Sequence, residues 1–165
     1  MIENIVRYLH SARVPFRLSS YPSQEAEPKA AHPLPPHAAL VASQILTVDG
    51  RAVLVGFPAG ERVDLDAVGS TLGGVALEGS TADLPDELRY ARGWVPPFGQ
   101  LYGLPVVLDE RLTRAAVLAF QPFGESDYLE IPYEDYARLE QPRIASFASF
   151  GELGPARGAR PRPGA

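Results

Sequence analysis

The strongest constraint on the fold lies in the middle of the chain, where two apolar runs flank an Asp-Gly pair. Residues 45–48 and 52–57 are rich in Ile, Leu, Val and Phe, and Asp49-Gly50 lies between them. A two-residue hairpin turn of this kind needs positive φ at both central residues, which Asp followed by Gly readily provides. The sequence therefore predicts a β-hairpin over residues 45–57.

Short helices and short strands are expected on both sides of this hairpin. The expected helices cover 2–13, 38–43, a segment capped by Asp64 and ending at Leu72 before Gly73-Gly74, a segment from Thr81 or Asp83 to Arg89, and 133–139. The other expected strands cover 14–18, 75–77, 105–108, 116–120 and 128–131. Residues 20–37 contain five prolines and are expected to form a long loop. This pattern predicts an α+β fold with a mixed, largely antiparallel sheet.

The domain organisation follows from length and local composition. A chain of 165 residues fits one domain with a genuine core, and the sequence holds no repeat. We expect this domain to occupy residues 1–153. The tail, 154–165, consists largely of Arg, Pro, Gly and Ala and is expected to be disordered.

Charge and cysteine content exclude several classes of protein. The chain has no cysteine, which excludes disulfides, thiolate nucleophiles and cysteine-ligated metals. The net charge is −5, and residues 1–153 carry −8 once the three tail arginines are removed. A basic nucleic-acid footprint is therefore confined to the tail. No apolar stretch approaches the roughly 20 residues of a membrane helix, and the N-terminus is too polar for a secretory signal. We expect a cytoplasmic protein.

Side chains with obvious catalytic chemistry are few. Three histidines, His10, His32 and His37, lie in the N-terminal quarter without a further ligand that would favour zinc, so no metal or cofactor is expected. No serine lies in a nucleophile-elbow context. Three carboxylates are candidate acids or bases, although solvated loop carboxylates are commoner; they are Asp109, Glu125 and Asp127. Any chemistry should therefore rest on a site built from backbone groups.

The best candidate for such a site is the stretch GWVPPFGQLYG at residues 93–103. Pro96 and Pro97 fix φ and donate no hydrogen bonds. The amides that remain as donors belong to Gly93, Trp94, Val95, Phe98 and Gly99. A rigid loop of this kind can present N–H groups to a carbonyl or an oxyanion, with Trp94 as a stacking wall. The alternative is a proline-stiffened turn with Trp94 and Phe98 as core plugs.

The same stretch, read with its flanks, resembles the YbaK-like superfamily of prolyl-tRNA synthetase editing domains and free-standing aminoacyl-tRNA deacylases. The resemblance rests on GWVPPFGQLYGLPVVLDERL and AFQPFGESDYLEIPYEDYARLEQP, with ILTVDGRAVLVGFPAGERVDLDAVGSTLGG upstream. Members carry a G-x-x-x-P loop before a strand that ends in Asp, which here are Gly93, Pro97 and Asp109. The resemblance covers residues 2–142 and is weak over 15–40.

What the resemblance implies is a barrel-like curved sheet flanked by helices, and an editing hydrolase. Such an enzyme cleaves the ester between a mischarged amino acid and the tRNA 3′ end by attack of water. The implied partner is the mischarged tRNA 3′ end or an aminoacyl small molecule, with no cofactor. The implied substrate-binding residues are Tyr21, Gln44, Trp94, Val95, Pro96, Pro97, Phe98 and Gly99. The implied catalytic positions are Gly93, Ser43 and Glu125.

Three positions depart from the family pattern. Ser43 stands where many members have a lysine, with Gln44 as the near alternative, and Glu125 stands where relatives often have histidine. Tyr90 replaces a common cysteine. The first two changes make the site more negative, which weakens phosphate binding. Three functions stay open: an editing hydrolase, a non-catalytic module that binds an aminoacyl group or small molecule, and a partner-binding protein that uses Trp94, Phe98 and Tyr102.

Overall fold

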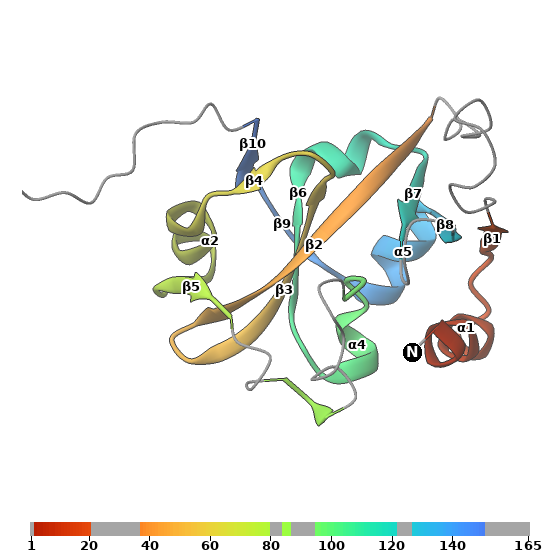
Figure 1. The fold of residues 1–165 in the computed structure, drawn as a ribbon, viewed down its shortest axis with the longest axis horizontal. Helices are drawn as coiled ribbons and strands as arrows, with labels where there is room; N and C mark the ends of the chain where they lie inside the picture. Colours follow the sequence, from red (N-terminus) through yellow and green to blue (C-terminus); the bar gives the residue numbers. More distant parts are fainter. Residues whose placement is uncertain (1, 21–36, 80–83, 87–94, 122–126, 151–165) are drawn as a thin grey trace, which may run out of the picture.

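The computed structural model describes residues 2–20, 37–79, 84–86, 95–121 and 127–150 (Figure 1). Its helices are α1 (Ile2–Ser11), α2 (Leu65–Leu72), α4 (Gly99–Tyr102), α5 (Tyr133–Glu140) and the 3-10 helix η2 (Glu110–Arg114). Its main sheet contains β1 (Arg17–Ser20), β2 (Ala38–Val48), β3 (Arg51–Pro58), β5 (Ala76–Glu78), β6 (Val106–Asp109), β7 (Val117–Phe120), β8 (Asp127–Pro132) and β9 (Arg143–Ala145). A second sheet pairs β4 (Arg62–Val63) with β10 (Ala148–Ser149).

The main sheet is mixed, as predicted. Its strand order is β1-β8-β7-β2-β3-β6-β9, and β5 pairs with β2 beside this path. Four of its pairings are antiparallel and three are parallel: β2 with β7, β3 with β6, and β6 with β9. The α+β class with a mixed sheet and flanking helices is thereby confirmed.

The predicted hairpin forms the long central pair of this sheet. β2 and β3 run antiparallel from Val41 opposite Pro58 to Val48 opposite Arg51. The turn residues Asp49 and Gly50 have φ of 49° and 77°, both in the left-handed region that the Asp-Gly pair was expected to supply.

Side-chain alternation along the hairpin divides the core into two layers. Ala42, Leu46 and Val48 point to the face covered by α2, where they pack with Val68 and Phe147. Val41 points to the opposite face, which α1, α4 and α5 cover. Figure 1 shows α2 on one side of β2 and β3, and α1 with α5 on the other.

The caps of α2 are formed by the residues that the sequence indicates. The Asp64 carboxylate accepts hydrogen bonds from the amides of Asp66 and Ala67, and Gly73 ends the helix with φ of 74°. Both boundaries were predicted, because a short acidic side chain satisfies the free amides of a first turn and glycine adopts the left-handed C-terminal conformation without strain.

The predicted helix over 38–43 is wrong, because β2 begins at Ala38 and runs unbroken to Val48. Residues 38–41 pair in parallel with β7, a partner 79 residues further along the chain, and such long-range pairing overrides local propensity. The first strand is also displaced. It occupies 17–20 instead of 14–18, after a turn in which Arg13 has φ of 56°.

Several predictions fall outside the described residues. They are most of the loop over 20–37, most of the helix ending at Arg89, and the tail over 154–165. The assignment of residues 1–153 to one domain stays a prediction. No helix among the described residues is long and apolar enough to cross a membrane.

Candidate functional site

The candidate site is built where β2 changes partners along one edge. β7 pairs with residues 38–41 of β2, and β5 pairs with residues 46–48 on the same edge. Between them, within the described part of the chain, residues 42–44 have a strand partner only on the β3 side. Ser43 lies in the middle of this interval and is half-buried.

Ser43 fastens the loop that contains Pro96 and Pro97 to the sheet. The described part of this loop, residues 95–100, is called the proline loop below. Its hydroxyl donates a hydrogen bond of 2.5 Å to the carbonyl oxygen of Val95. Gly56, the residue opposite Ser43 on β3, leaves room for this approach: a Cβ there would lie 3.3 Å from Pro97 Cγ and 2.9 Å from Leu108 Cδ1. The loop therefore lies directly on the Ser43–Gly56 pair.

Every carbonyl from Val95 to Gly99 accepts a hydrogen bond. Their donors are, in order along the chain, the Ser43 hydroxyl, the Phe98 amide, the Tyr136 hydroxyl, the Leu101 amide and the Leu104 amide. The bond from the Phe98 amide to the Pro96 carbonyl is 2.7 Å and closes a three-residue turn. Because five successive peptide carbonyls are engaged, this stretch is rigid and its conformation is fixed by the surrounding fold.

Phe98 is a core residue. It is fully buried, and its ring centroid lies 5.3 Å from that of Phe120 and 5.7 Å from that of Tyr136. The prediction that Phe98 is an exposed contact for a partner is therefore wrong: in this position it supports the loop from below. Tyr102, from the same prediction, is half-buried, and Trp94 lies outside the described residues.

Glu140 holds the far end of the loop. Its Oε2 accepts a hydrogen bond of 3.0 Å from the Gln100 amide at the start of α4, and its Oε1 accepts one of 3.0 Å from the Tyr8 hydroxyl. Burial raises the pKa of Glu140, and the bonds from the Gln100 amide, the Tyr8 hydroxyl and the Gly99 amide offset part of that rise. Nothing in the sequence marks Glu140 as a site residue, because a glutamate at the end of an amphipathic helix usually faces solvent.

The amides of Phe98 and Gly99 are thus directed into the protein. The first bonds the Pro96 carbonyl, and the second interacts with the Glu140 carboxylate. Of the five amides expected as donors to a substrate, those of Gly93 and Trp94 lie outside the described residues, as do Tyr21 and Glu125. The Val95 amide has no hydrogen-bond acceptor among the described residues, and Val95 is 4% exposed.

Gln44 and Ser43 do not face the same pocket. Neighbouring residues of a strand point to opposite faces of the sheet. Ser43 points toward the proline loop, whereas Gln44 lies on the face of Ala42 and Leu46, which α2 covers. The prediction that Gln44 lies beside the loop with Ser43 is therefore corrected. The sequence did not reveal this, because a helix was expected over 38–43 and a strand only from residue 45.

Asp109 is a structural carboxylate. It is completely buried and accepts bonds from the Arg111 amide, Arg111 Nε and the amides of Phe147 and Ala148. Burial alone would raise its pKa, but these hydrogen bonds outweigh burial and lower it. Arg111 also forms an ion pair with Glu61. With its oxygens engaged in this way, Asp109 joins β6, η2 and β10 and is not available as a general base.

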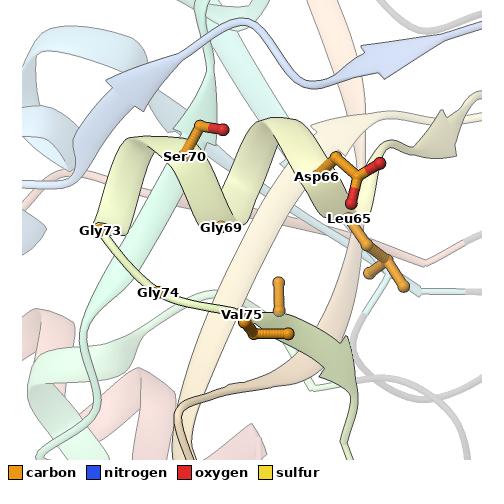
Figure 2. Close-up of a pocket in the computed structure, with 8 residues that line it drawn as sticks. Leu65, Asp66, Gly69, Ser70, Gly73, Gly74 and Val75 are labelled. Atoms are coloured by element: carbon orange, nitrogen blue, oxygen red, sulfur yellow. The ribbon is translucent and has the colours of Figure 1, made fainter.

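A hollow of about 570 Å³ lies between α2 and the segment that leads into β5 (Figure 2). Its lining residues are Leu65, Asp66, Gly69, Ser70, Gly73, Gly74, Val75 and Ala76. It belongs to the α2 face of the sheet, opposite the face on which Ser43 contacts the loop. Among the described residues, no three His, Cys, Asp or Glu side chains gather closely enough to hold a metal ion.

A comparison against families of known proteins assigns the chain to a family. A model of the aminoacyl-tRNA editing domain family matches residues 24–139, well over half of the 165 residues. The chain therefore belongs to the aminoacyl-tRNA editing domain family.

Solved structures with the same fold include three informative ones. A putative signal transduction protein from Marinobacter aquaeolei VT8 is 17% identical with a TM-score of 0.67, covering 88% of this chain and 30% of its own. A putative trans-editing enzyme for prolyl tRNA synthetase is 15% identical with a TM-score of 0.64, and the match covers 89% of this chain and 96% of that enzyme. The hypothetical protein APE2540 is 13% identical with a TM-score of 0.64, and the match covers 88% of this chain and 99% of that protein. A search of curated proteins gave no match. These similarities show the fold.

Proposed function

We propose that this protein is an ester hydrolase that removes a wrongly attached amino acid from the 3′ end of a tRNA in the cytoplasm. Water adds to the ester carbonyl, the bond to the ribose oxygen breaks, and the products are a free amino acid and a tRNA with a free 3′ hydroxyl. The observation that carries the proposal is the position of the proline loop. Ser43 holds this loop beside residues 42–44 of β2, between the parts of that strand that pair with β7 and β5.

In this mechanism the chain contributes mainly rigid backbone. Donors fixed before the substrate arrives stabilise charge that develops on the carbonyl oxygen without reorganisation. The amides of Gly93, Trp94 and Val95 are the candidates, because those of Phe98 and Gly99 are bonded internally. Glu125 stays a candidate for orienting the water.

Ser43 supplies no positive charge for the tRNA phosphate or ribose, and its hydroxyl hydrogen is used by the Val95 carbonyl. Ser43→Lys is therefore expected to raise the rate of deacylation, because the gain in attraction for the phosphate exceeds the loss of the single bond to the Val95 carbonyl. Thr47→Lys is the matched control, because it adds the same charge to the same face of β2 about 13 Å further along. An equal rise in both variants would mean that the effect is one of net charge and not of position.

The deciding assay measures release of amino acid from a panel of mischarged tRNAs at micromolar enzyme. Turnover above buffer on at least one member is expected, and the absence of turnover on every member would overturn the proposal.

A second candidate is a non-catalytic module that binds an aminoacyl group. The observation in its favour is that the hydroxyl of Ser43 and the amides of Phe98 and Gly99 are used within the protein, which leaves few donors for chemistry. This candidate predicts that a non-hydrolysable aminoacyl-adenosine raises the melting temperature, since a ligand of the folded state stabilises it, while the tRNA panel shows no turnover.

A further inference from the structure

Helix α5 contacts the proline loop at two points through polar side chains. Tyr136 and Glu140 are four residues apart and so lie on one face of the helix, one above the other. The Tyr136 hydroxyl donates a 2.6 Å bond to the Pro97 carbonyl, and Glu140 accepts a 3.0 Å bond from the Gln100 amide. Phe98 and Gly99 lie between Pro97 and Gln100 in the chain, so α5 holds both ends of the segment 97–100.

Both contacts are buried, which makes them costly unless the partners are well placed. Tyr136 is fully buried and Glu140 is 3% exposed. Burying a hydroxyl or a carboxylate is unfavourable without compensating hydrogen bonds. Apolar side chains would cover the core equally well at these two positions, so packing alone does not explain the choice of residues. Hydrogen bonding to the loop backbone does.

The orientation of Glu140 is itself fixed from a second helix. Tyr8 of α1 donates to Oε1, which directs Oε2 toward the Gln100 amide. Tyr136 is held by its ring contacts with Phe98 and Phe120. Helices α1 and α5, which are distant in sequence, therefore determine the position of backbone residues 97–100.

We propose that Tyr136 and Glu140 are positioning residues for the reaction at the proline loop. They set the backbone of residues 97–100, and through it the position of the Val95 amide, the nearest N–H before the two prolines, relative to a bound ester. This inference rests on the proposed deacylase function. Neither residue touches the substrate; each acts through the loop.

The test compares three variants of the full chain: Tyr136→Phe, Glu140→Gln and Glu140→Ala. Tyr136→Phe removes only the hydroxyl that reaches Pro97. Glu140→Gln retains an oxygen that can accept from Gln100, whereas Glu140→Ala does not. Tyr133→Phe is the matched control, because it removes a hydroxyl from the first turn of the same helix.

The readouts are kcat and KM for the best tRNA of the panel, and amide hydrogen exchange at Phe98, Gln100 and Leu101. Small displacements of a reacting geometry reduce rates strongly. We expect Tyr136→Phe and Glu140→Ala to lower kcat about 10-fold or more with little change in KM, and to speed exchange at these amides. Glu140→Gln should recover most of kcat, and Tyr133→Phe should behave as the wild type.

The proposed function and the positioning role of Tyr136 and Glu140 are contradicted by different results. An inactive wild type overturns the proposed function, and the inference with it. An active wild type with unchanged kcat in Tyr136→Phe and Glu140→Ala overturns the inference alone, whether or not amide exchange becomes faster. Loss of kcat in Glu140→Gln equal to that in Glu140→Ala would also contradict it, because the acceptor oxygen would then not be what matters.

Discussion

Replacing Asp109 by alanine should destabilise this protein far more than an ordinary loss of an aspartate. Its carboxylate accepts bonds from the backbone amides of Phe147 and Ala148, and from Arg111 through both the amide and Nε. Each buried donor left unsatisfied costs about 1–3 kcal/mol, and breaking one side of a buried ion pair costs about 3–5 kcal/mol. Arg111 keeps Glu61 as a partner, so we expect a total loss of about 3–5 kcal/mol.

Urea unfolding followed by circular dichroism measures this loss. With an m-value of about 2 kcal/mol/M, the midpoint should fall by about 1.5–2.5 M. Asp64→Ala is the control: Asp64 also accepts two backbone amides, but it is an exposed helix cap, where the loss is about 1 kcal/mol. If the two variants lose similar stability, then burial of the Asp109 network does not matter and the reasoning is refuted.

Three further predictions concern backbone and pH. Gly99→Ala places a Cβ against the Leu104 carbonyl oxygen and 2.5 Å from Val106 Cγ2, so a loss of about 2–3 kcal/mol is expected in the same urea assay, and a neutral result would show that the loop can shift. Gly50→Ala has open space but φ of 77°, so it should cost only about 1–2 kcal/mol; a loss as large as that of Gly99→Ala would contradict the steric argument. The pKa of Glu140 is raised in the folded protein. Its contribution to stability is therefore complete at pH values below the pKa of the unfolded chain, and is lost as the pH rises through the pKa of the folded protein. Urea midpoints between about pH 5 and about pH 8 should therefore fall less in Glu140→Gln than in the wild type, and equal falls would count against a raised pKa.

The parts of the fold that were predictable are those fixed by local chemistry. The Asp49-Gly50 turn rests on left-handed conformations that few residues adopt well, and the Asp64 cap rests on a short side chain that accepts backbone amides, so the sequence indicates both directly. The helix expected over 38–43 failed for the opposite reason. That segment is a strand because β7 lies beside it, and such a partner is not visible in a local window.

The candidate site also contains residues that the sequence indicates and residues that only the structure shows. The proline loop was identified from its own residues and their family resemblance, and its closeness to Ser43 is what the structure shows. Tyr136 and Glu140 were not identified as functional, because their importance lies in what they contact and not in any motif. The sequence left Phe98 open as a core plug or an exposed contact, and three-dimensional packing makes it a core residue.

The five engaged carbonyls between Val95 and Gly99 have a consequence for the way this site can evolve. The shape of the loop is specified by side chains on β2 and α5 together with the loop's own hydrogen bonds, so residues that touch a substrate can be replaced without rebuilding the framework. Ser43 is one of these framework side chains, so a change at this position alters how the loop is held as well as the charge beside it. A substitution that leaves these hydrogen bonds intact can change what the loop binds while the backbone of residues 95–99 keeps its conformation.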